Sequence, residues 1–181
     1  MGPSALLASI LLLATLAGCS DKQKNNPQPS QMLRPQRCKP PPIEIFMQAS
    51  EKLNLNAEGQ SMPVEVRVLL LMERGLFDQL DFETVWKDDS KALGKDLIRS
   101  ASLTVFPGKL KIFPMKSTPA LAYVALVGIF RHPLGQRWKH VVDVRAQNQK
   151  CASGEDLHTI VHAVLRGNTI TKPRTTPASG S

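Results

Sequence analysis

The side chains best suited to metal chemistry are two histidines in the sequence His-Thr-Ile-Val-His, His158 and His162. In an extended strand, residues four apart lie on the same face, so both imidazoles could reach one ion. The zinc-protease motif needs a glutamate directly after the first histidine, and Thr159 stands there instead. We therefore expect both histidines on a half-exposed strand face, and we predict no metal site.

Other catalytic patterns are missing from the sequence as well. It contains no glycine-rich phosphate-binding loop, no Gly-X-Ser-X-Gly nucleophile elbow and no Cys-X-X-Cys pair. His132 and His140 have no spacing that pairs them with a nucleophile. Glu155 and Asp156 follow a Ser-Gly pair, where turn formation explains them better than acid–base catalysis. We predict that the protein is not an enzyme, needs no cofactor and binds no small-molecule substrate.

The net charge of +8 lies mostly outside the part of the chain that can form a core. Residues 20–42 carry +4 and Arg174 carries +1, which leaves +3 for residues 43–172. A nucleic-acid-binding domain places its basic excess on the folded part, often with aromatic side chains nearby. The distribution therefore argues against nucleic acid as a partner.

An apolar run of 13 residues, 5–17, is followed by Gly-Cys, which places Cys19 at its end. Thirteen residues match the core of an export signal and fall short of the roughly 20 needed for a membrane-spanning helix. Leu-Ala-Gly-Cys at the end of such a run resembles the lipobox of bacterial lipoproteins. In that class the signal is cleaved before the cysteine, whose thiol receives a diacylglycerol and whose new amino group is acylated. The resemblance implies a signal peptide at 1–18 and lipidation at Cys19.

The lipid on Cys19 would decide the compartment. Several acyl chains on one cysteine give stable membrane attachment, since each buried CH₂ is worth about 0.8 kcal/mol. By resemblance to bacterial lipoprotein sorting, an aspartate directly after the cysteine favours the inner membrane. Here that residue is Ser20, and Asp21 follows one position later. We therefore expect the protein at the outer membrane, on its periplasmic face.

The chain after Cys19 is rich in proline. Residues 20–42 hold six of the fourteen prolines and almost no apolar residues, which predicts an extended, partly polyproline-II tether. Once Cys19 is lipidated, Cys38 and Cys151 remain. Two cysteines in the oxidising periplasm form a disulfide or stay as free thiols. A bridge would join the end of the tether to the loop before the last long strand.

Between the tether and the C-terminal tail, apolar and polar residues alternate with a period of two. The alternation predicts about seven to eight strands, at residues 43–49, 64–72, 97–105, 110–112, 120–130, 138–144, 157–166 and 169–171. Short connections between such strands are typical of a β-sandwich. The expected organisation is a signal peptide (1–18), a lipidated cysteine with its tether (19–42), a β-sandwich domain (43–172) and a disordered tail (173–181).

One insertion changes the period. From Leu76 to Gly94, apolar residues recur at helical spacing. Asp78 is placed to cap this helix, Phe77 and Phe82 are placed as a hydrophobic staple, and Gly94 is a suitable stop. We expect one helix between the second and third strands, on a sheet face or at its edge. The fold class is therefore expected to be all-β with a small helical insertion.

Several short motifs follow one another in order along residues 53–138. They are an asparagine-rich loop before Pro63-Val64, then Val66-Arg67-Val68, Phe77-Asp78-Gln79, Asp81-Phe82, Leu93-Gly94, Asp96-Leu97, Pro107-Gly108, Phe130-Arg131 and Arg137-Trp138. In their order and spacing they resemble the outer-membrane lipoprotein of type VI secretion systems, the TssJ/SciN (VasD) family. The resemblance covers most of residues 43–172 and includes the lipobox.

This resemblance implies a transthyretin-like β-sandwich with an added helix and no catalytic activity. It implies a structural anchor that binds the periplasmic C-terminal domain of the inner-membrane component TssM and links the membrane complex to the outer membrane. The family's main contact with TssM is the loop between the first two strands, here about residues 51–62. The candidate contact residues are Asn54, Leu55, Asn56, Ala57, Glu58, Gly59, Gln60 and Ser61.

The same loop suits binding on physical grounds. Twelve residues is long for a hairpin connection, and polar groups surround one large apolar side chain, Leu55. A solvated turn is the simpler interpretation. Because sandwiches host many functions, the alternative for the whole chain is a periplasmic ligand-binding or hydrolytic lipoprotein. That alternative predicts a concave pocket with converging polar groups.

Replacing Cys19 should abolish lipidation, because no other cysteine follows an apolar signal core. We expect the Cys19→Ala variant to take up no labelled palmitate in a bacterium that processes lipoproteins. The Cys38→Ala variant is the matched control and should be labelled as the wild type is. Label on the Cys19→Ala chain would contradict the lipobox assignment.

Overall fold

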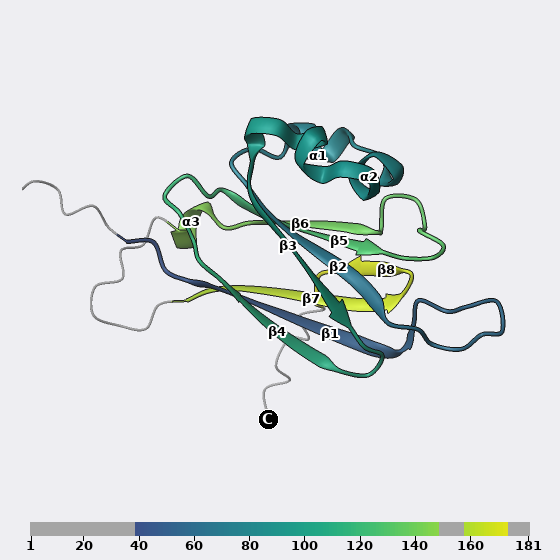
Figure 1. Cartoon of the computed structure of the whole chain (residues 1–181). Helices are drawn as coiled ribbons and strands as arrows, with labels where there is room; N and C mark the ends of the chain where they lie inside the picture. Colours follow the sequence, from purple (N-terminus) through teal and green to yellow (C-terminus); the bar gives the residue numbers. More distant parts are fainter. Residues whose placement is uncertain (1–38, 149–157, 174–181) are drawn as a thin grey trace, which may run out of the picture. The chain divides into compact units, whose positions relative to one another are not determined.

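The computed structural model describes residues 39–148 and 158–173, in which eight strands form two four-stranded sheets (Figure 1). The strands are β1 (Ile43–Leu53), β2 (Val64–Leu71), β3 (Leu97–Val105), β4 (Leu110–Met115), β5 (Tyr123–Ile129), β6 (Lys139–Asp143), β7 (Thr159–Gly167) and β8 (Thr169–Thr171). One sheet has the order β4-β1-β7-β8 and the other β3-β2-β5-β6. The predicted β-sandwich of seven to eight strands is confirmed.

The first two strands lie in different sheets. β1 pairs with β4 and, in parallel, with β7, whereas β2 pairs with β3 and β5. The segment between β1 and β2 is therefore a bridge from one sheet to the other and not the hairpin connection that we expected from its position. Its two arms lie side by side, since the N–H of Met62 donates to the carbonyl of Leu53 at 3.0 Å, so most of its length projects from the sandwich.

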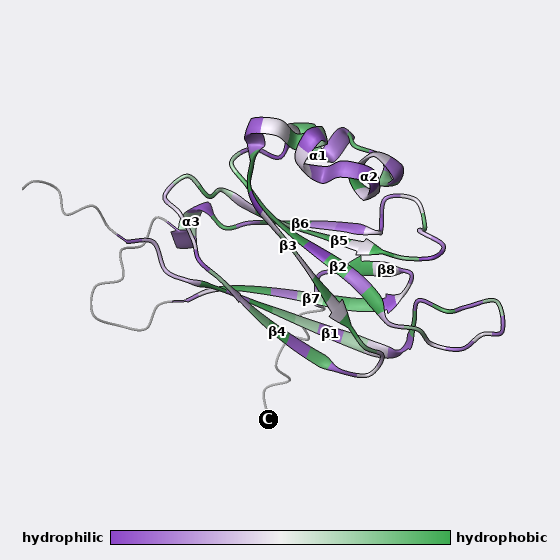
Figure 2. Cartoon of the chain, in the orientation of Figure 1, coloured by the Kyte–Doolittle hydropathy of each residue, from purple (hydrophilic) through white to green (hydrophobic). Residues whose placement is uncertain are grey.

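The core between the sheets follows the alternation of the sequence. Ile43, Ile45 and Met47 of β1 are fully buried, and the residues between them are partly exposed. Figure 2 shows this alternation as green and purple bands along the strands. Successive side chains of a strand point to opposite faces, so each strand gives one face to the core.

β5 is an exception, because nearly all of its residues are buried on both faces. Its outer face lies beside the outer face of β2, where Leu69 and Leu71 are also fully buried. Two helices, α1 (Gly75–Gln79) and α2 (Phe82–Leu93), lie over this side of the sheet (Figure 1). Their buried side chains Phe77, Val85 and Leu93 belong to the same core cluster. The helical insertion therefore covers a sheet face that would otherwise expose apolar residues.

The prediction of a single helix capped by Asp78 is wrong. Asp78 lies inside α1 and pairs with Arg74 at 2.7 Å, and the chain is extended at Leu80. The cap of α2 is Asp81, whose carboxylate accepts a 2.7 Å hydrogen bond from the backbone N–H of Thr84. This hydrogen bond lowers the pKa of Asp81. The predicted stop is confirmed, since Gly94 follows α2 with a φ of 51°.

Lys139 explains the break between the two helices. Its Nζ donates to the backbone carbonyls of Phe77, Asp78 and Leu80 at 3.0, 2.9 and 2.9 Å. It also lies 5.0 Å from the ring centroid of Trp138, the residue before it on the chain. An ammonium has three N–H donors, and three carbonyls satisfy them here. Burial lowers the pKa of Lys139 from its ordinary value of 10.5. The contact joins the end of α1 to the sheet beneath it.

Removing this ammonium should loosen the helical insertion. We expect the Lys139→Met variant to lose about 1–3 kcal/mol in its free energy of unfolding, because three carbonyls lose their donor. Urea denaturation of the soluble mature chain, residues 20–181, measures the change. In the control variant Lys87→Met, an exposed pair with Glu83 is lost, which should cost at most about 0.5 kcal/mol. Equal effects in the two variants would refute the role of Lys139.

Candidate functional site

The bridge between β1 and β2, residues 54–63, projects from one end of the sandwich (Figure 1). The β3–β4, β5–β6 and β7–β8 connections lie at the same end (Figure 1). Each of these connections follows a strand that runs toward this end. The four connections together form the surface on which the predicted contact residues lie.

Asn54 fixes the base of the bridge. It is only 4% exposed, and its φ of 47° lies in the left-handed region, which asparagine tolerates better than most residues. Its Nδ2 donates to the carbonyl of Pro63 at 2.8 Å, and its Oδ1 accepts from the backbone N–H of Arg131 at 2.8 Å. Its own N–H donates to the carbonyl of Gly167 at 2.8 Å. The structure therefore places this predicted contact residue inside the domain, where its side chain and its backbone N–H together join three connections.

The tip of the bridge is closed by Asn56 and Gln60. The Oδ1 of Asn56 accepts from the Gln60 N–H at 2.7 Å, and its Nδ2 donates to the Gln60 side-chain oxygen at 3.0 Å. Gly59 donates its N–H to the carbonyl of Asn56 at 3.1 Å and has a φ of 78°, which favours glycine. The exposed residues of the tip are Ala57, Glu58, Gly59 and Gln60. The tip is thus ordered by its own hydrogen bonds, which lowers the entropy cost of binding a partner.

Leu55 and Ser61 lie on the two arms of the bridge. The hydroxyl of Ser61 donates to the carbonyl of Glu51 at 2.6 Å and accepts from the N–H of Leu53 at 3.4 Å. These bonds hold the returning arm against the end of β1. Leu55 is partly buried, so only part of its side chain is left for a partner.

Of the two candidate metal ligands, His162 lies on the exposed face of β7, and His158 directly precedes this strand. The Nδ1 of His158 is 2.9 Å from a carboxylate oxygen of Glu44, and the ring of His162 lies 5.1 Å from that of Phe46. The predicted strand face is confirmed for His162, which is exposed, and not for His158, which lies just before the strand. Within residues 39–148 and 158–173, no group of three His, Cys, Asp or Glu side chains is placed to hold a metal ion.

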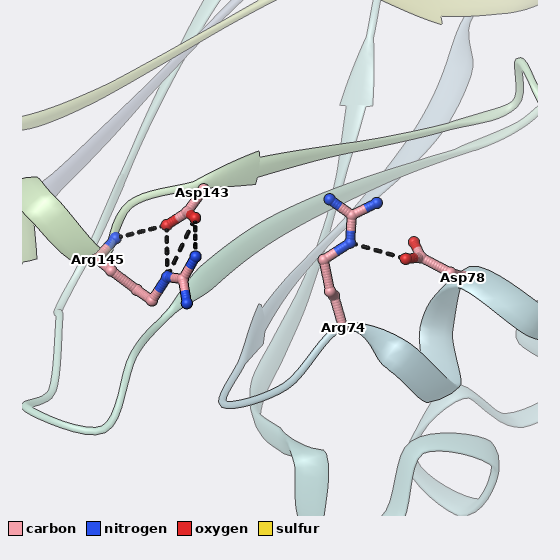
Figure 3. Close-up of polar contacts among 4 residues, drawn as sticks. All are labelled: Arg74, Asp78, Asp143 and Arg145. Carbon is pink, nitrogen blue, oxygen red and sulfur yellow. Dashed lines mark hydrogen bonds and ion pairs between the residues drawn. The ribbon is translucent and has the colours of Figure 1, made fainter.

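A polar cluster that we did not predict lies beside Tyr123 and consists of two arginines and two aspartates, which Figure 3 shows. Arg74 pairs with Asp78 and Arg145 pairs with Asp143, and the two guanidinium carbons lie 6.0 and 5.1 Å from the centre of the tyrosine ring. The hydrogen bond from Arg145 lowers the pKa of Asp143. Both carboxylates are thus paired with arginines. The two arginines cover the ring of Tyr123, which is only 8% exposed.

The three cysteines of the sequence, Cys19, Cys38 and Cys151, lie outside the described residues. Lipidation of Cys19 and a bridge between Cys38 and Cys151 therefore stay predictions. No helix in the part of the chain that the structure describes is long and apolar enough to cross a membrane.

Fold and surface together define a β-sandwich with a helical cover and one projecting, internally bonded bridge suited to contact with another protein. Residues 41–163 match the family model described as type VI secretion lipoprotein, VasD, EvfM, TssJ, VC_A0113. The chain belongs to this family. The resemblance that the short motifs indicated is thereby confirmed.

Solved structures share the fold. The type VI secretion lipoprotein TssJ1 of Pseudomonas aeruginosa is 22% identical, with a TM-score of 0.64, and the match covers 76% of this chain and 99% of that one. Lip of Serratia marcescens, a membrane-bound component of the type VI secretion system, is 20% identical, with a TM-score of 0.66 and the same coverage. A chain in the structure of the TssM C-terminal domain from EAEC is 21% identical, with a TM-score of 0.60, covering 74% of this chain and 98% of that one. No curated protein matches the sequence significantly.

Removing the Asn54 side chain should destabilise the base of the bridge. In Asn54→Ala, Pro63 and Arg131 lose their partners and the left-handed backbone becomes strained. We expect a loss of about 1–3 kcal/mol in urea denaturation. The Asn54→Gly variant keeps the backbone conformation without strain. We therefore expect a smaller loss of stability than in Asn54→Ala, and this loss measures the contribution of the two side-chain hydrogen bonds. Wild-type stability in both variants would contradict the role assigned to Asn54.

Proposed function

We propose that the protein is an outer-membrane lipoprotein of a type VI secretion membrane complex and that it acts as a structural anchor. Its partner would be the periplasmic domain of a TssM-like inner-membrane protein. The observation that carries this proposal is the family match over residues 41–163, because that family consists of type VI secretion lipoproteins. The likeness to a chain in a structure of the TssM C-terminal domain supports the choice of partner.

The pre-ordered bridge is the surface that we propose for docking. Its tip exposes short polar side chains and backbone groups, and Leu55 lies beside them on one arm. A partner that covered Leu55 would gain up to roughly 1.5–3 kcal/mol from apolar burial, less the part that is already buried. Because Asn54 and Asn56 already fix the backbone, little ordering entropy would be lost on binding.

An anchoring role needs attachment rather than catalysis. We propose that Cys19 carries the lipid and that residues 20–42 form the tether to the sandwich domain. At about 3 Å per residue in an extended chain, such a tether would hold the domain some tens of Å from the membrane. We propose no enzymatic activity, since Asp78, Asp143 and His158 each pair with another side chain of the domain.

A charge on the bridge should weaken docking without unfolding the domain. We expect Leu55→Asp to reduce the affinity of the soluble mature chain for the TssM-like periplasmic domain at least tenfold, which corresponds to about 1.4 kcal/mol. Calorimetric titration measures the affinity, and a thermal melt controls for stability. The matched variant Ile160→Asp changes another exposed apolar residue, 49% exposed on β7, and should bind as the wild type does.

Three results would count against the proposed docking surface or the proposed partner. Equal affinity and equal melting of Leu55→Asp and the wild type would exclude the bridge as the docking surface. A large fall in melting temperature would show instead that Leu55 belongs to the core. Absence of any binding by the wild-type chain would contradict the proposed partner itself.

A further inference from the structure

Beside the bridge, the surface forms a concavity of about 410 Å³ whose lining includes three cationic side chains, Arg137, Arg166 and Lys172. The other described lining residues are Val164, Thr169 and Thr171. Among the described residues, no carboxylate belongs to this lining. We call this surface the basic pocket.

The three cations come from three segments that backbone bonds hold together. Arg137 lies in the β5–β6 connection, and its carbonyl accepts from the N–H of Ile170 in β8 at 2.7 Å. Arg166 lies near the end of β7, and its carbonyl accepts from the hydroxyl of Thr169 at 2.9 Å. Lys172 directly follows β8. The convergence of charge is therefore built into the strand pairing.

These charges have no acidic partner among the described residues. None of the ion pairs found there involves Arg137, Arg166 or Lys172, although two other arginines pair with aspartates in the cluster of Figure 3. Burial, and then the charge of Lys172, lowers the pKa of nearby His140, which favours the neutral form of this imidazole. Like charges that converge without a counter-charge repel one another. An anionic ligand would relieve that repulsion.

The basic pocket adjoins the base of the bridge. Gly167, which follows Arg166, accepts the backbone hydrogen bond of Asn54 at 2.8 Å. The β5–β6 connection that carries Arg137 also donates to the Asn54 side chain, through the N–H of Arg131. A protein seated on the bridge would therefore lie next to the pocket.

We propose that the basic pocket receives acidic side chains of the protein that docks on the bridge, an inference that rests on the proposed function. Arginine binds carboxylates through two parallel N–H donors, and two arginines and a lysine offer sites for more than one carboxylate. Val164, Thr169 and Thr171 complete the lining, and side chains of the partner can pack against them. Charges at the edge of an interface act mainly on the rate of association and on its salt dependence.

Association kinetics test this inference. The soluble mature chain, residues 20–181, is mixed with the TssM-like periplasmic domain in 50 and 300 mM NaCl. We expect the wild-type association rate to fall about tenfold between these salt concentrations. The triple variant R137Q/R166Q/K172Q should associate about tenfold more slowly at low salt and respond little to added salt. The matched control K95Q/R99Q/K111Q removes the same number of exposed cations outside the pocket and should behave as the wild type does.

Each outcome decides one question. Equal slowing in both triple variants would show that net charge alone acts, and an unchanged pocket variant would show that the partner does not use this surface; either result overturns the inference. If Leu55→Asp weakens binding while the pocket variant matches the wild type, the proposed function stands and this inference falls. If the wild type does not bind at all, the proposed function itself fails.

Chemical cross-linking identifies the bound group. A carbodiimide joins an amine directly to a carboxylate in contact with it, so we expect Lys172 to be linked to an aspartate or glutamate of the partner. Lys111 should show no such link. A link from Lys172 only to a carboxylate of its own chain would overturn the inference. Binding of the wild-type chain to vesicles of phosphatidylglycerol and phosphatidylethanolamine would also overturn the inference if the pocket variant lost that binding. The pocket would then bind a lipid.

Discussion

At the end of β1, the chain turns through a single left-handed residue, and the side chain of that residue joins the connections around it. Asn54 donates to Pro63, accepts from Arg131 and, through its backbone, donates to Gly167. A buried amide with unmet hydrogen bonds would cost more than these bonds gain, so the arrangement is stable only when all three segments are in place. The position of the projecting bridge and that of the basic pocket both depend on this junction.

Most of the strands could be predicted from the sequence, because a sheet with one buried face imposes a period of two on each strand. The alternation from Ile43 to Met47 predicted β1 correctly, and the strands expected at 157–166 and 169–171 correspond to β7 and β8. Which sheet each strand joins could not be predicted. The parallel pairing of β1 with β7 links residues more than a hundred positions apart in the chain, and no local pattern records such a contact.

The helical insertion is a second case in which local sequence could not predict the structure, here at a single residue. Asp78 and Asp81 are equally good caps by type, and local sequence does not choose between them. The choice follows from Lys139, which lies about sixty residues further along and binds the carbonyls at the end of α1. In the bridge, too, residue type predicted exposed polar groups at residues 57–60 but not the inward orientation of Asn54. The proximity of the three cations in the basic pocket could not be predicted either, because only strand pairing brings them together.

The bridge and the basic pocket would act on different parts of the binding free energy. A rigid apolar and amide surface acts at short range, so it sets how long a complex lasts. Cations act over about one Debye length, roughly 8 Å at physiological salt, so they orient the partners before contact. A domain held to a membrane by a long tether meets its partner often, but in many orientations. For such a domain, charge placed beside the docking surface would raise the fraction of encounters that succeed, while the ordered bridge would determine whether the complex persists.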